Sequence, residues 1–137
     1  MQHVHRLEVR TRGKGLYPFT REVAAWVTST QAETGLLTVF IQHTSASLVI
    51  QENADPDVVL DLADYFERIA PENDPLYRHD TEGPDDMPAH IRTALTGTSL
   101  SIPVIKGQMA LGTWQGLYVF EHRSGQQRRS VVLHLSE

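Results

Sequence analysis

The chain has 137 residues, of which 40% are hydrophobic and 21% are charged, and this balance predicts a single globular domain spanning residues 1–137. It contains no cysteine, which excludes disulfides, thiolate zinc sites and cysteine nucleophiles. The formal net charge of -5 argues against a nucleic-acid partner held by general electrostatics. The unusual feature of the composition is its seven histidines.

The first six residues lack the apolar core of a signal peptide, and no later run is long enough to span a bilayer. We therefore expect a cytoplasmic protein with no membrane partner.

Residues 3–11 alternate between apolar and polar side chains, which predicts a half-buried strand near a sheet edge. His3 and His5 then share one face of this strand, as surface polar residues rather than ligands. Residues 20–33 predict a helix with Val23, Trp26, Val27 and Thr30 on one face. Gly35 is expected to end this helix, and Trp26 to anchor the core.

Residues 36–41 form an almost continuous apolar run, which predicts a central strand covered on both faces. This strand leads into His43, Thr44 and Ser45, ahead of another apolar run. The hydroxyl groups suit phosphate and the imidazole suits a metal or a proton, whereas the alternative is a turn that satisfies its own backbone. A histidine between buried runs needs a partner, which favours the functional interpretation of His43.

Asp55 and Pro56 are typical of a helix start, and an apolar face then continues to Ile69.

Residues 77–91 hold the densest group of metal-binding and proton-moving side chains. If a helix begins at Asp86, then Asp86 and His90 share one face of its first turn, where Pro88 is tolerated. A second histidine, His79, lies across the Gly83-Pro84 bend, and the combination suits a hard or borderline metal. The alternative is a solvated acidic loop that complements the helix dipole, and this stretch alone leaves both open.

The last third of the chain predicts strands at residues 99–105, from Met109, at 117–120 and at 129–135, with a hairpin turn at 124–126. We expect Trp114, which lies between glycines, to pack against the protein. The predicted fold class is α+β: mostly antiparallel sheets, joined largely by hairpins and packed with two longer helices and one short helix.

Four segments, His43–Leu48, Gln51–Pro56, Glu82–Ile91 and Leu111–Tyr118, resemble the YjbQ-like family, and in the same order. The resemblance covers nearly the whole chain and implies a compact fold of sheets and helices. It also implies a homotrimer with a histidine-lined site near subunit contacts, able to bind zinc and an anion such as phosphate. The implied metal ligands are His43, His79 and His90, with Glu82 and Asp86 beside them. The position of His122 in this pattern is left open.

Proteins of this family are often labelled secondary thiamine-phosphate synthases, after a weak reaction joining a thiazole phosphate to a pyrimidine diphosphate. The resulting hypothesis is a metal-dependent enzyme acting on a phosphorylated small molecule, with zinc as the metal, or Mg²⁺ bridging a diphosphate. Thr44, Ser45 and Arg123 are expected to orient the anion. Glu82 or Asp86 is expected to act as a base or to orient a ligating histidine.

Two rival hypotheses remain. One is a metal-binding and anion-binding trimer without catalysis. The other is a structural trimer whose histidines only satisfy buried polar groups.

Overall fold

A computed structural model describes all residues from Met1 to Glu137. Its eleven elements, in chain order, are β1 (Gln2–Arg12), β2 (Gly15–Pro18), α1 (Thr20–Thr30), β3 (Thr34–Ile41), β4 (Ala46–Glu52), α2 (Pro56–Ile69), α3 (Asp86–Thr96), β5 (Ser99–Ile105), β6 (Gln108–Met109), β7 (Gln115–Glu121) and β8 (Gln126–Ser136).

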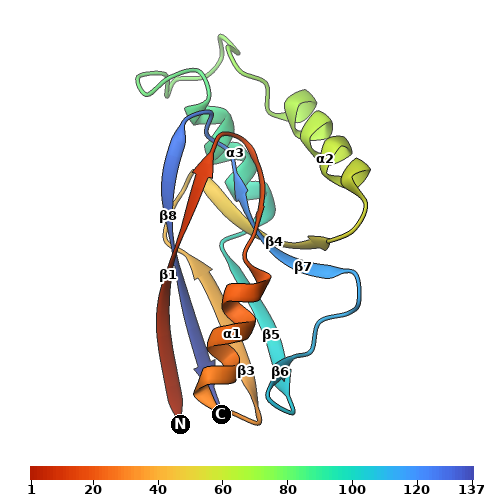
Figure 1. The fold of residues 1–137 in the computed structure, drawn as a ribbon. Helices are drawn as coiled ribbons and strands as arrows, with labels where there is room; N and C mark the ends of the chain where they lie inside the picture. Colours follow the sequence, from red (N-terminus) through yellow and green to blue (C-terminus); the bar gives the residue numbers. More distant parts are fainter.

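The strands form two antiparallel sheets, a five-stranded sheet in the order β1-β8-β3-β5-β6 and a three-stranded sheet in the order β2-β7-β4. Helix α1 lies against the large sheet, whereas α2 and α3 lie at the end of the molecule away from the two termini (Figure 1). The α+β class is therefore confirmed, as is the half-buried strand β1 at a sheet edge. None of the three helices combines the length and the hydrophobicity that a membrane-spanning helix needs.

The hydrophobic core lies between the two sheets and α1. It is one cluster of 16 buried residues, to which α1 contributes Val23 and Val27 and both sheets contribute their inward-facing positions. Trp26 is only half-buried against this core, and its ring stacks on His5. Burial of this cluster is the main stabilising contribution to the fold.

The first predicted helix boundary is wrong. Helix α1 ends at Thr30, because Gln31 adopts a left-handed conformation (φ 61°) and its N–H donates to the carbonyl of Thr28. Gly35, expected to stop the helix, lies instead within β3, where it pairs with Val104. The early stop frees residues 34–41 to pair with both β5 and β8.

We expect Gly35→Ala to destabilise the protein by about 1–3 kcal/mol, the usual range for forcing extra atoms into a packed site. A Cβ at position 35 would collide with the backbone carbonyl of Ser136, which a side-chain rotation cannot relieve. Urea unfolding of the variant beside Gly125→Ala checks this, since a Cβ at 125 meets no atom. Equal midpoints for the two variants would contradict the prediction.

Strand β3 is central, as predicted, but only one of its faces is covered. Leu37 and Val39 are fully buried, whereas Leu36 and Phe40 on the opposite face are 47% and 45% exposed. The continuous apolar run predicted burial on both sides, but within one chain nothing packs on the outer face of the large sheet.

The predicted hairpin at 124–126 is also wrong. Strands β7 and β8 belong to different sheets, so the turn carries the chain from one sheet to the other. The only neighbours in sequence that pair with each other are β5 and β6, so hairpins do not dominate the connections. Trp114 is 62% exposed in the segment between β6 and β7, which corrects its predicted packing.

Candidate metal centre

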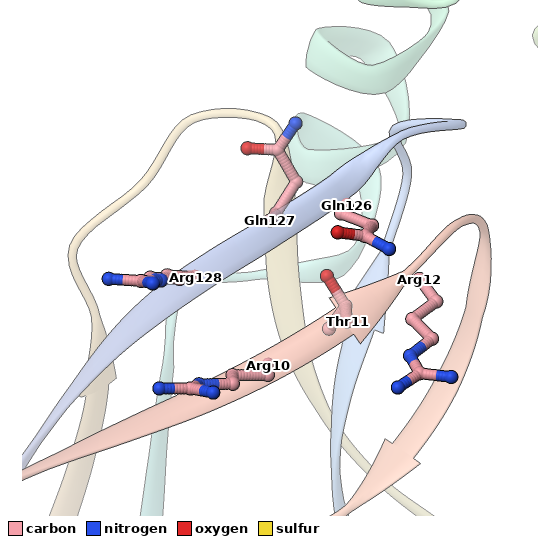
Figure 2. Close-up of a pocket in the computed structure, with 6 residues that line it drawn as sticks. All are labelled: Arg10, Thr11, Arg12, Gln126, Gln127 and Arg128. Carbon is pink, nitrogen blue, oxygen red and sulfur yellow. The ribbon is translucent and has the colours of Figure 1, made fainter.

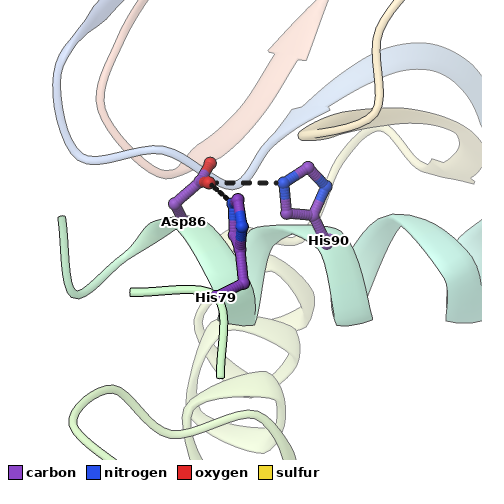
Figure 3. Close-up of side chains that lie close together, drawn as sticks. All are labelled: His79, Asp86 and His90. Carbon is purple, nitrogen blue, oxygen red and sulfur yellow. Dashed lines mark hydrogen bonds and ion pairs between the residues drawn. The ribbon is translucent and has the colours of Figure 1, made fainter. Parts of the chain in front are cut away.

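A group of three potential metal ligands lies at the start of α3. Asp86 and His90 come from the first turns of this helix, as their spacing predicted, and His79 comes from the loop before it. One ligand atom from each residue lies within 4.8 Å of the others. Figure 3 shows the three side chains turned toward one another.

Asp86 is the centre of this group. It is only 2% exposed, and its two carboxylate oxygens have different partners. Oδ1 accepts a hydrogen bond from Nη1 of Arg123 (2.8 Å), while Oδ2 lies 2.5 Å from Nε2 of His79 and 3.3 Å from Nε2 of His90. Burial acts to raise the pKa of Asp86, but hydrogen bonding to His79 and the charge of Arg123 outweigh it and lower that pKa. The carboxylate is therefore ionised, with Oδ2 facing both imidazoles.

The hydrogen bond on the far side of the His90 ring shows which of its two nitrogens carries a hydrogen. Nδ1 of His90 lies 3.0 Å from the carbonyl oxygen of Thr44, and because a carbonyl only accepts, Nδ1 must carry the hydrogen. If the ring is neutral, Nε2 carries no hydrogen, and its lone pair points at the Asp86 carboxylate. Two facing acceptors repel, so this arrangement calls for a proton or a cation between His90 and Asp86.

His79 is the more accessible of the two histidines, with a side chain 43% exposed. Its Nε2 lies between Oδ2 of Asp86 and Oε2 of Glu82, the latter at 3.2 Å. The hydrogen bond to Asp86 is the main reason that the pKa of His79 is raised. Glu82 itself is exposed and points into the same group, so it is a carboxylate free to change partners.

Arg123 holds the acidic side of this centre in place. Its Nε donates to Oδ2 of Asp85 (2.8 Å), its Nη1 to Asp86, and its Nη2 to the carbonyl of Glu82 (2.9 Å). These bonds occupy the guanidinium within the protein, so Arg123 positions the carboxylates here. Its predicted role in orienting an anion stays a prediction.

The three other predicted site residues lie in the loop between β3 and β4. His43 is not part of the group: its Nε2 accepts a hydrogen bond from the backbone N–H of Ser130 (2.8 Å). Thr44 touches the group through its carbonyl bond to His90, and Ser45 bonds to Arg129. The predicted ligand set of His43, His79 and His90 is therefore not assembled within one chain, whereas His79, Asp86 and His90 are.

The loop of His43 lines an open depression of about 510 Å³, whose walls also include Phe40, Gln42, Thr44 and Ser45. Burial is the main reason that the pKa of His43 is lowered. Its imidazole is therefore neutral, and the only lone pair of a neutral ring already accepts from Ser130.

Two buried polar groups beside the centre were not predicted. Glu121 is completely buried and pairs with Arg129, which is 3% exposed. His122 is also completely buried, with Nε2 at 2.9 Å from Oγ of Ser47 and Nδ1 without a hydrogen-bond partner. Burial lowers the pKa of His122 to about 3. In the sequence, these residues form a polar run directly after an apolar strand, and such a run is equally typical of an exposed turn.

Comparison with known proteins places the chain in a family. A family model described as UPF0047 protein YjbQ-like matches residues 5–137. A UPF0047 protein of Synechocystis sp. is 53% identical over 135 residues, covering 98% of this chain and 92% of that protein. The UPF0047 protein YjbQ of Escherichia coli O157:H7 is 42% identical over 128 residues, covering 92% of each.

A solved structure of a conserved hypothetical protein from Thermus thermophilus is similar with a TM-score of 0.84 at 37% identity, covering 94% of this chain and 97% of that one. The fold and sequence together define a YjbQ-like protein, and the chain belongs to the YjbQ/UPF0047 family. The resemblance inferred from the four sequence segments is thereby confirmed. The names of these relatives state no reaction, so an account of activity must come from the chemistry of the site.

Proposed function

We propose that this protein is a metal-dependent enzyme acting on a phosphorylated small molecule, with the metal held by His79, Asp86 and His90. The supporting observation is the Nε2 atom of His90, which faces the buried Asp86 carboxylate while its own hydrogen is committed to Thr44. A divalent cation would remove this repulsion by taking both groups as ligands.

The donor set fits zinc. Two imidazoles and one carboxylate are a common set of three protein ligands in catalytic zinc sites, which keep a further position for water or substrate. Mg²⁺ prefers oxygen ligands and would fit only with help from the oxygens of a diphosphate substrate. Arg123 on Oδ1 of Asp86 and the Thr44 carbonyl on Nδ1 of His90 are the supporting hydrogen bonds that such ligands usually have.

In this proposal each residue has a distinct task. A bound metal would supply Lewis-acid polarisation of a phosphoryl oxygen. Both carboxylate oxygens of Asp86 already have partners, so Asp86 serves as a ligand and not as a base. The exposed Glu82 serves as the base that accepts a proton. Thr44 and Ser45 orient the anion in the depression that they line with His43, and the carbonyl of Thr44 connects this depression to His90.

Turnover of phosphorylated compounds by zinc-loaded and Mg²⁺-loaded protein tests the proposal. We expect hydrolysis or transfer on at least one compound, including the pair of a thiazole phosphate and a pyrimidine diphosphate. Glu82→Gln should lower kcat by about 100-fold, the usual contribution of a positioned base, while the metal content stays unchanged. His5→Gln, far from the centre in β1, is the matched control. Metal-loaded protein inactive on every class of compound would favour a non-catalytic metal-binding module.

We also propose that the protein is a homotrimer. Support comes from the outer face of the large sheet, where Val4, Leu36, Phe40 and Ile105 are 45–67% exposed, an unusual patch for a monomer. Light scattering on the wild type and on Phe40→Glu checks this. A monomeric mass for the wild type would contradict it.

A further inference from the structure

A cluster of three arginines lies on the β1–β8 ladder, at the end where the ladder approaches the loop after β7. Arg10, Arg12 and Arg128 line a depression of about 380 Å³ together with Gln126, Gln127 and Thr11. None of the six lining residues is hydrophobic. Figure 2 shows Arg10 and Arg128 extending in the same direction from neighbouring strands, with Arg12 further along β1.

Two of these arginines form a like-charge pair. Arg10 and Arg128 are direct partners in the antiparallel register of β1 and β8. Like charges placed directly opposite one another destabilise a sheet, and the neighbouring pair, Arg12 and Gln126, adds a third cation on the same side. An arrangement of this kind would be stabilised by a source of negative charge.

The chain itself supplies little of that charge. Arg10 has one acidic partner, Glu8, in an exposed contact of 3.3 Å, and the guanidinium groups of Arg12 and Arg128 have no hydrogen-bonding partner in the chain. This is notable in a protein with 17 acidic and 12 basic residues, where carboxylates are in excess. The cluster is thus an uncompensated positive site on a negatively charged protein.

We propose that this cluster, Arg10, Arg12 and Arg128, binds a phosphate group carried by a small molecule. Guanidinium forks donate in pairs to phosphate oxygens, and two parallel forks on adjacent strands give the planar donors that such a group needs. The amide group of Gln126, on the same face of the ladder as the arginines, adds neutral donors at the same depression. In the single chain the depression is open to solvent, so we expect binding to weaken as salt rises.

The site is separate from the metal centre but shares a loop with it. Gln126 lies two residues after Ser124, whose N–H donates to Asp85, and Arg123 of the same loop donates to Asp86. A ligand at the arginine cluster would therefore lie against the loop that orders the candidate metal ligands. The proposal does not depend on a metal being bound.

Calorimetric titration with inorganic phosphate and with pyrophosphate, at low ionic strength and with a chelator present, tests this site. We expect saturable binding by the wild type and about tenfold or greater weakening in Arg128→Gln, the loss of about one charge-assisted bidentate contact. Arg21→Gln is the matched control, because it makes the same charge change at an exposed arginine of α1 without side-chain partners. His90→Ala should bind like the wild type, so failure of the metal centre and failure of this site are distinguishable.

Four outcomes would overturn the proposal. They are no binding by the wild type, equal weakening in Arg21→Gln and Arg128→Gln, and loss of binding in His90→Ala with retention in Arg128→Gln. The fourth is a fall in oligomeric mass in Arg128→Gln, measured by sedimentation, because the cluster would then serve a second copy of the chain.

Discussion

Replacing Arg129 with alanine is expected to lower the free energy of unfolding by about 3–5 kcal/mol, the usual effect of breaking a buried ion pair from one side. Arg129 donates from Nε to Oε1 of Glu121 at 2.7 Å and from Nη2 to Oε2, and both residues are buried. Without the guanidinium, a carboxylate held at a lowered pKa by that hydrogen bonding would be left in the interior without its counter-charge.

The pair has this effect because it joins the two sheets. Glu121 ends β7 in the small sheet, Arg129 lies in β8 of the large sheet, and Thr11 of β1 donates a third bond to Glu121. Arg129 also donates to the carbonyl and hydroxyl oxygens of Ser45, beside the residue that bonds His90. Its loss should therefore loosen the metal centre as well as the contact between the sheets.

Urea unfolding at neutral pH measures this effect. The double variant Glu121→Gln, Arg129→Met should lose less than the sum of the single variants, because it leaves no buried charge unpaired. Arg21→Ala, at an exposed position, should stay within about 0.5 kcal/mol of the wild type. An Arg129→Ala protein as stable as this control would show that the pair does not hold the sheets together.

Acidification from pH 7 to pH 5 is expected to cost about 2 kcal/mol through His122 alone. The pKa of this imidazole is about 3 in the folded protein against 6.5 for the free side chain, because burial and the charges of Arg92 and Arg129 oppose its protonation. Between these two pKa values, His122 is protonated in the unfolded chain and neutral in the folded chain. Stability from this source is thus complete above about pH 6.5 and is lost as pH falls toward 3.

The difference between wild type and His122→Gln isolates this contribution. The variant should show a flatter dependence of unfolding free energy on pH between 7 and 5, whatever its stability at pH 7. His79, with its raised pKa, acts in the opposite direction but is present in both proteins, so its contribution cancels. Identical slopes would mean that water or a proton reaches the His122 ring in the folded state.

Local patterns in the sequence predicted the elements well and their partners poorly. Alternation predicted β1, and capping residues predicted the start of α2 at Pro56. The turn at 124–126 reverses the chain as expected, but β8 does not pair with β7. It lies between β1 and β3, because the pairing of strands is decided by which of their faces must be buried. The residues of a turn therefore do not predict which distant strands will pair.

The candidate site was predictable to the same extent. The four-residue spacing of Asp86 and His90 predicted their shared face, because helical geometry fixes it once the helix start is known. The residues themselves had also pointed to His79, across the Gly83-Pro84 bend, and to His43, between two buried runs, and the resemblance implied that both are metal ligands. Within one chain, Nε2 of His43 accepts a hydrogen bond from the backbone N–H of Ser130. Glu121 and His122 could not be predicted as buried, because β7 is the central strand of the small sheet and is covered on both faces. On the side of His122, Phe66 of α2 packs on Phe120, which contacts the His122 ring, and this is a contact between distant segments.

Elemental analysis of tag-free protein, supplied with zinc and then freed of excess, tests the metal centre most directly. We predict about one zinc per chain in the wild type, with no metal in His79→Ala or His90→Ala, as expected when one of three protein ligands is removed. His43→Ala and His5→Gln should retain the metal, because neither side chain belongs to the group. Wild-type protein without zinc, or loss of zinc in His43→Ala alone, would contradict a centre built from His79, Asp86 and His90.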